Sequence, residues 1–169
     1  LAVNPFQSKF WEAVRVNDWL SVSAPTSAGK SRIIREYFLE IARQPGPFTL
    51  VYLVPTRALI EEVSRDLRRE LPSGVGVFTM PWDPDLKESS KTVLVVTQER
   101  LHLVLELIPS LTVNLLFVDE AQSLASDARG ILLQYAIESA IRRSPEAQVL
   151  FASPLTSNPE LFVEETPPD

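Results

Sequence analysis

The chain has 169 residues, 45% of them hydrophobic, which suits a single domain with a complete core. It contains no cysteine and one histidine, His102, so a disulfide framework and a thiolate metal site are excluded and a histidine metal site is not expected. The formal net charge of −6 argues against a protein that coats nucleic acid through bulk positive charge, although local contacts to a nucleic-acid backbone remain compatible with it.

The sequence carries no targeting or membrane signal. It has no uninterrupted run of about 18 apolar residues, and its N-terminus lacks the basic and apolar segments of a signal peptide. We therefore expect a cytoplasmic protein without a membrane partner. Because the sequence opens on Leu1 and stops at Asp169, we expect residues 1–169 to be one domain of a longer protein, with the acidic, proline-containing end 160–169 leading to a linker.

Apolar strands alternate with single amphipathic helices along the chain. Asn4 and Pro5 predict the start of the first helix, and the third helix is expected to bury Leu59, Val63 and Leu67. The alternation predicts an α/β fold with a mostly parallel sheet of about five to seven strands and helices on both faces. The expected strands are 19–23, 48–54, 75–79, 92–96, 115–118 and 148–152; the expected helices are 5–14, 31–43, 57–71, 98–108 and 127–143, with a surface loop over 80–90.

A small-residue loop follows the first strand and ends in Gly29, Lys30 and Ser31. This is the pattern of a phosphate-binding loop, in which backbone N–H groups face the phosphates, the lysine reaches the outer phosphates and the serine holds Mg²⁺. The first glycine of the usual pattern is Ala24 here. Taken alone, the segment is therefore equally compatible with an ordinary helix start.

A second signal lies at the end of the apolar run 115–118, which is followed directly by Asp119 and Glu120. A buried parallel strand would deliver both acids to the carboxyl edge of the sheet. In a P-loop NTPase, Asp119 would bind Mg²⁺ and Glu120 would orient and deprotonate the attacking water. The alternative is an acidic pair that caps the following helix, and the presence of both motifs disfavours it.

Two other junctions between a strand and a helix combine threonine with arginine, Thr56 with Arg57 and Thr97 with Arg100. Exposed N–H groups, a hydroxyl and a guanidinium at such a junction favour binding of a phosphate, which is recognition of the nucleic-acid backbone and not of its sequence. Each pair alone could be an N-cap threonine beside a solvated arginine. Their position in order between the two preceding motifs favours the strand-binding interpretation.

Together these motifs resemble the first RecA-like motor lobe of superfamily 2 helicases, the DEAD/DEAH-box-like ATPases, over nearly the whole chain. The resemblance implies an ATPase that uses Mg²⁺, contacts the backbone of one DNA or RNA strand, and works with a second RecA-like lobe of the same protein. Gln7 resembles the Q-motif glutamine that reads the adenine edge, and Asp119 to Gln122 is similar to motif II. Residues 24–31 resemble motif I, so the implied nucleotide-binding residues are Gln7, Pro25, Thr26, Ser27, Ala28, Gly29, Lys30, Ser31 and Gln122.

Two motifs differ from the usual pattern of that family. Motif II ends in Gln122 instead of histidine or aspartate, and Ser153-Pro154-Leu155 stands where Ser-Ala-Thr is usual. In the family these positions couple the ATP site to strand binding, so Gln122 and Ser153 are the implied coupling residues. The small-residue loop and the final glutamine resemble the DExH side of the superfamily, which fits a divergent motor or translocase.

The leading hypothesis is an ATP-dependent helicase or translocase whose catalytic residues are Lys30, Asp119 and Glu120, with Ser31 and Asp119 as metal ligands. Two alternatives remain: an ATPase motor of a restriction or remodelling complex that moves on duplex DNA, and a non-catalytic nucleotide-binding module. Since cationic groups from a partner surface stabilise the transferred phosphate in such enzymes, we expect residues 1–169 alone to hydrolyse almost no ATP.

Overall fold

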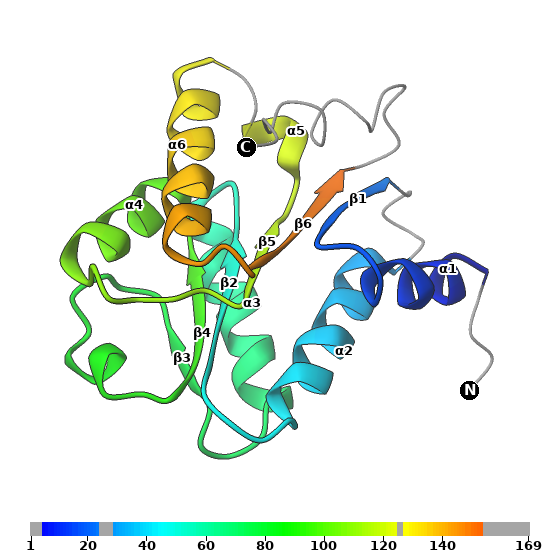
Figure 1. Ribbon diagram of the computed structural model, residues 1–169, viewed down its shortest axis with the longest axis horizontal. Coiled ribbons are helices and arrows are strands. Elements are labelled where there is room, and N and C mark those ends of the chain that lie inside the picture. The colour runs from blue at the N-terminus through cyan, green and yellow to red at the C-terminus, as the bar shows by residue number, and fades with distance from the viewer. Residues whose placement is uncertain (1–4, 24–28, 125–126, 154–169) are drawn as a thin grey trace.

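The computed structural model describes residues 5–23, 29–124 and 127–153 (Figure 1). The predictions for Asn4, for residues 24–28 and for residues 154–169 therefore lie outside the described residues. The strands are β1 (Trp19–Ser23), β2 (Phe48–Leu53), β3 (Gly76–Phe78), β4 (Lys91–Val96), β5 (Leu115–Val118) and β6 (Gln148–Ser153). The helices are α1 (Pro5–Val14), α2 (Lys30–Ala42), α3 (Arg57–Glu70), the 3-10 helix η2 (Pro84–Lys87), α4 (Gln98–Leu107), α5 (Ala121–Leu124) and α6 (Asp127–Arg143).

The described strands form one six-stranded sheet in the order β1-β6-β5-β2-β4-β3. Every neighbouring pair is parallel, which confirms the predicted α/β class with a mostly parallel sheet. Strand β6 lies between β1 and β5, so the strand before the lysine loop and the strand before the acidic pair flank it. Their carboxyl ends therefore meet at one edge of the sheet, where ligands of such sheets bind.

The two faces of the sheet carry separate cores, as predicted. Alternate strand residues point to opposite faces, so Tyr52 packs with α1, α2 and α3, whereas Val51 and Leu53 pack with α4 and α6. Figure 1 shows α1 and α2 on one side of the sheet and α4 and α6 on the other. Because β2 is buried along its whole length, its carboxyl end is held rigidly beside the acidic pair that follows β5.

Helix α3 buries Leu67 as predicted, but the other two predicted residues are not its most buried ones. Ile60, Ser64 and Leu67 are its buried residues, whereas Leu59 and Val63 are only partly buried at the margin of the core. Ser64 is polar, so a search for apolar residues at helical spacing does not identify it as buried. Its hydroxyl donates to the carbonyl of Glu61 at 3.3 Å, so it can be buried at little cost.

The segment predicted as a surface loop over 80–90 is partly structured. Its 3-10 helix η2 begins after Asp83, whose carboxylate accepts a hydrogen bond from the backbone N–H of Asp85. The turn buries Leu86, which is 2% exposed, and leaves Trp82 largely exposed. The prediction of a loop was therefore wrong for its central turn.

Among the described residues, no helix is long and apolar enough to cross a bilayer.

Candidate nucleotide and nucleic-acid site

Helix α2 begins at Lys30, one residue before the predicted start, and Gly29 is its N-cap. Gly29 has a φ of 79°, a left-handed conformation that side chains disfavour, and it offers no side chain to cap the helix. The first intrahelical bond runs from the N–H of Ile33 to the carbonyl of Gly29. The three preceding N–H groups thus have no acceptor within the helix and, together with the positive end of the helix dipole, fit an anion.

Lys30 is buried at this edge, with only 7% of its surface exposed. Its ammonium donates to the backbone carbonyl of Ser153 at 2.6 Å, which links the start of α2 to the end of β6. An ammonium carries three N–H donors, so this bond orients the lysine and uses only one of its donors. The Ser153 hydroxyl is buried there as well, and it has no hydrogen-bond partner among the described residues.

Asp119 lies at the end of β5, and both of its carboxylate oxygens accept a hydrogen bond. The Tyr52 hydroxyl donates to Oδ2 at 3.0 Å and the backbone N–H of Glu120 donates to Oδ1 at 3.0 Å. Burial raises the pKa of the Asp119 carboxyl above its ordinary value, while the Tyr52 hydrogen bond and the charge of Lys30 act in the opposite direction. The positive charge of Lys30 thus favours the ionised form of the Asp119 carboxyl, although burial has the larger effect on its pKa.

Glu120 has a left-handed backbone with a φ of 50°, the one such residue other than glycine in the described ranges. A glutamate pays a conformational cost in this region, and such cases concentrate at functional sites. The Gln122 side-chain amide donates to Oε2 of Glu120, which fixes the carboxylate. The side-chain oxygen Oε1 of Gln122 is buried without a hydrogen-bond partner in the part of the chain that the structure describes.

The two predicted backbone-binding junctions lie at the carboxyl ends of β2 and β4, which are neighbours in the sheet. Thr56 and Thr97 occupy the N-cap positions of α3 and α4, but neither side chain makes a cap hydrogen bond to the described backbone. Arg57 is exposed. Arg100 instead donates to the carbonyl of Thr79 at 2.8 Å, so it is tied to the segment that follows β3. The geometry places both pairs on the same edge of the sheet as Lys30 and Asp119.

The family model of the DEAD/DEAH box helicase matches residues 4–159. The chain belongs to the DEAD/DEAH box helicase family. Membership agrees with the observed sheet, and it supports the RecA-like fold and the nucleotide-binding character predicted from the motifs.

Relatives named for RNA and for DNA both resemble this helicase domain. It is 26% identical over 166 residues to the DExH-box ATP-dependent RNA helicase DExH14 of Arabidopsis thaliana, a match that covers 88% of this chain and 8% of the relative. It is 28% identical over 148 residues to the ATP-dependent DNA helicase Hel308 of Pyrococcus horikoshii, covering 85% of this chain and 20% of the relative. The chain thus spans a small part of the curated helicases that it matches.

A solved structure of the helicase Lhr of Mycobacterium smegmatis, bound to ssDNA and AMP-PNP, is similar in fold and sequence. The TM-score is 0.72 and the identity 28%, over 90% of this chain and 23% of Lhr. This likeness confirms the prediction of a superfamily 2 helicase motor domain.

The structure describes most, but not all, of the predicted helicase site residues. Gln7 is half-buried on α1 and Ser31 is exposed in the first turn of α2. Pro25, Thr26, Ser27 and Ala28 lie outside the described residues. Tyr52 was not predicted, although a tyrosine hydroxyl near the end of a largely apolar strand before Pro55 was a usable signal.

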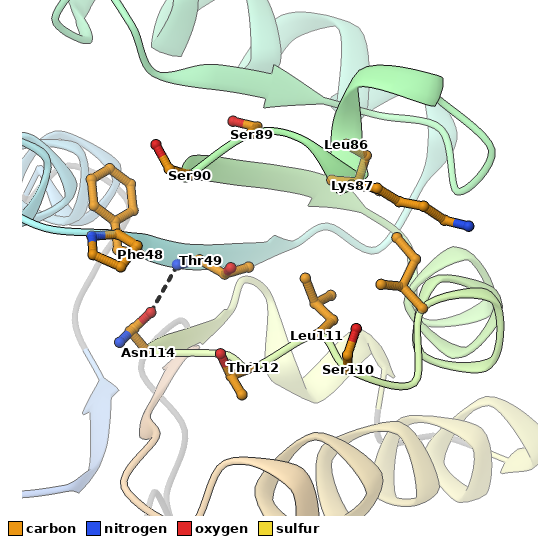
Figure 2. Close-up of a pocket in the computed structure, with 12 residues that line it drawn as sticks. Phe48, Thr49, Leu86, Lys87, Ser89, Ser90, Ser110, Leu111, Thr112 and Asn114 are labelled. Carbon is orange, nitrogen blue, oxygen red and sulfur yellow. Dashed lines mark hydrogen bonds between the residues drawn. The ribbon is translucent and has the colours of Figure 1, made fainter.

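A separate hollow of about 350 Å³ lies at the opposite, amino edge of the sheet. Figure 2 shows Thr49 at the start of β2, Ser89 and Ser90 before β4, and Asn114 before β5 around it, with Asn114 accepting a hydrogen bond from the Thr49 N–H at 2.8 Å. None of the predicted site residues lines this hollow. The candidate site is therefore the carboxyl edge.

Proposed function

We propose that this chain is the first motor lobe of an ATP-dependent helicase or translocase. One observation supports the proposal most strongly: Lys30 and Asp119 lie at the same carboxyl edge of the sheet. The buried Lys30 ammonium donates to the Ser153 carbonyl at the end of β6, at 2.6 Å, and both carboxylate oxygens of Asp119 accept hydrogen bonds. A helix N-terminus without a side-chain cap lies beside them. This combination of donors and acids suits a nucleoside triphosphate with its metal ion.

The residues present fit Mg²⁺ and ATP in chemical type. Asp119 offers a carboxylate, and Ser31, exposed in the first turn of α2, offers a hydroxyl; hard cations such as Mg²⁺ prefer these oxygen donors. Bound Mg²⁺ would neutralise charge that develops on the phosphates. The N–H groups at the start of α2 and the remaining N–H donors of Lys30 would bind the phosphate oxygens, and Gln7 would contact the adenine edge.

Glu120 would orient the attacking water and take its proton. Its hydrogen bond from Gln122 supports this role, because a fixed carboxylate holds the water in one direction. Gln122 lies in α5 directly after the acidic pair, and Ser153 is the last residue of β6, so they are the proposed links between the ATP site and strand binding. Ser153 contacts Lys30 through its backbone carbonyl.

The nucleic-acid partner is proposed to be one strand of DNA or RNA, held through its backbone by the two threonine-arginine junctions. A second RecA-like lobe of the same protein would close over the site and supply cationic groups for the phosphoryl transfer. Lhr was solved with ssDNA and the other relatives are named for RNA and for DNA, so the strand type has to be tested with both.

The function is tested on the full-length protein by steady-state ATP hydrolysis with and without single-stranded DNA, single-stranded RNA and duplex DNA. Stimulation by a single strand, together with displacement of an annealed strand, is the expected result. Stimulation only by duplex DNA with movement but no displacement would support a duplex translocase. Nucleotide binding without any hydrolysis would support the non-catalytic module and contradict the proposal.

Arg57→Ala should lower affinity for all single-strand sequences alike, because the exposed guanidinium would pair with a phosphate. The slope of log affinity against log salt concentration should become shallower by about one, the value for one lost phosphate contact. Arg100→Ala should have the same uniform effect. Fluorescence anisotropy at several salt concentrations measures both. Arg142→Ala, an exposed arginine in the last turn of α6, is the matched control and should change nothing. A loss that depended on base sequence would show that these arginines read bases.

A further inference from the structure

Tyr52 places a polar group in the middle of an apolar strand. All six residues of β2 are buried, and Tyr52 is 2% exposed. A buried hydroxyl is normally hydrogen-bonded, and the partner here is Oδ2 of Asp119, at 3.0 Å. The tyrosine is thus the side chain of β2 that connects the core to the acidic pair.

The strand register explains why a tyrosine reaches Asp119. Tyr52 lies directly opposite Phe117 on the neighbouring parallel strand β5, and Asp119 follows Phe117 by two residues on the same face. Such a diagonal neighbour is within reach of an aromatic side chain. The ladder continues to this point, because the N–H of Asp119 donates to the carbonyl of Leu53 at 2.9 Å. The backbone hydrogen bond therefore fixes the position of the Asp119 main chain, and the bond from the Tyr52 hydroxyl fixes the orientation of its carboxylate.

The ring of Tyr52 is held in place by its neighbours. It packs edge-to-face against Phe117, with ring centroids 4.7 Å apart and planes at 76°, and lies 5.8 Å from Phe38 of α2. The hydroxyl is thereby aimed at a fixed point. Among the described residues, each carboxylate oxygen of Asp119 accepts one bond, from the Tyr52 hydroxyl or from the N–H of Glu120, and a carboxylate oxygen has a second lone-pair direction for another ligand.

We infer that Tyr52 is a positioning residue for metal binding, which orients the Asp119 carboxylate toward the Mg²⁺ of the bound nucleotide. The inference rests on the proposed function of the site. Partners that hydrogen-bond to a metal ligand orient it, and their loss typically lowers metal affinity by about 10- to 100-fold. A phenylalanine would fill the same space, so packing alone does not account for the hydroxyl.

The test compares ADP affinity of the full-length protein in Mg²⁺ and in EDTA, by calorimetry, for wild type, Tyr52→Phe and Tyr37→Phe. Tyr37→Phe is the matched control. Tyr37 lies on α2, and its hydroxyl donates to the Gln148 side chain at 2.7 Å instead of to Asp119. Tyr52→Phe should reduce the gain in affinity that Mg²⁺ provides by about tenfold and leave affinity in EDTA unchanged. Tyr37→Phe should match wild type in both conditions.

An unchanged Mg²⁺ gain in Tyr52→Phe, or an equal loss of affinity in Mg²⁺ and in EDTA, would overturn the inference, because only packing would then be at work. A second comparison does not depend on the fold of a single variant: in the Asp119→Asn background, Tyr52→Phe should cause no further change in the Mg²⁺ gain. If wild type itself gains no affinity from Mg²⁺, the proposed function fails, and the role of Tyr52 with it.

Discussion

Glu120→Gln in the full-length protein should slow ATP hydrolysis by about 10²- to 10⁴-fold, the usual contribution of a general base. Nucleotide binding should be preserved, because the change keeps the shape of the side chain and leaves Asp119 with its bonds from Tyr52 and from the backbone N–H of residue 120. Steady-state hydrolysis and ADP affinity, measured on the same preparation, separate the two effects.

The control for this variant is Glu62→Gln, which removes one exposed carboxylate from α3. It should leave both hydrolysis and binding at the wild-type level. Equal hydrolysis by wild type and Glu120→Gln would remove Glu120 from the chemistry and, with it, the role that we propose for the hydrogen bond from Gln122.

Lys30→Ala should instead weaken nucleotide binding itself, by roughly 10- to 100-fold, since charge-assisted hydrogen bonds to phosphate are lost. The effect should be large because Lys30 is buried, where an ammonium interacts more strongly than at the surface. Titration of ADP with Mg²⁺ into the full-length variant measures it. Lys87→Ala, an exposed lysine at the amino-edge hollow, is the matched control. Wild-type affinity in Lys30→Ala would place the phosphates elsewhere.

The local features of the fold were predictable from the sequence because they depend on neighbouring residues. All six expected strands match the observed ones to within one residue at each end, since each is a short apolar run between turn residues. The strand β3 is one residue shorter at each end than expected, because it pairs with β4 over only Gly76 to Phe78. The short helix α5 after the acidic pair was missed, since four residues are too few for a periodic pattern.

The contacts that build the site were not predictable in this way, because they join residues far apart in the chain. The bond from Tyr52 to Asp119 and the bond from Lys30 to Ser153 both depend on the order of strands in the sheet. An alternation of strands and helices gives the class of the sheet but does not state which strand lies beside which. The motifs indicated the residue types of the site, and the topology decides which of them meet.

The proposed function requires that ATP binds at the carboxyl edge, between Lys30 at the start of α2 and Asp119 at the end of β5. A crystal structure of the full-length protein with Mg²⁺ and AMP-PNP tests it most directly. We predict the outer phosphates on the first-turn N–H groups of α2 and on the Lys30 ammonium, with the metal ion beside Asp119. A nucleotide bound in the hollow at the amino edge, or phosphates that contact neither Lys30 nor the start of α2, would contradict the proposed nucleotide site.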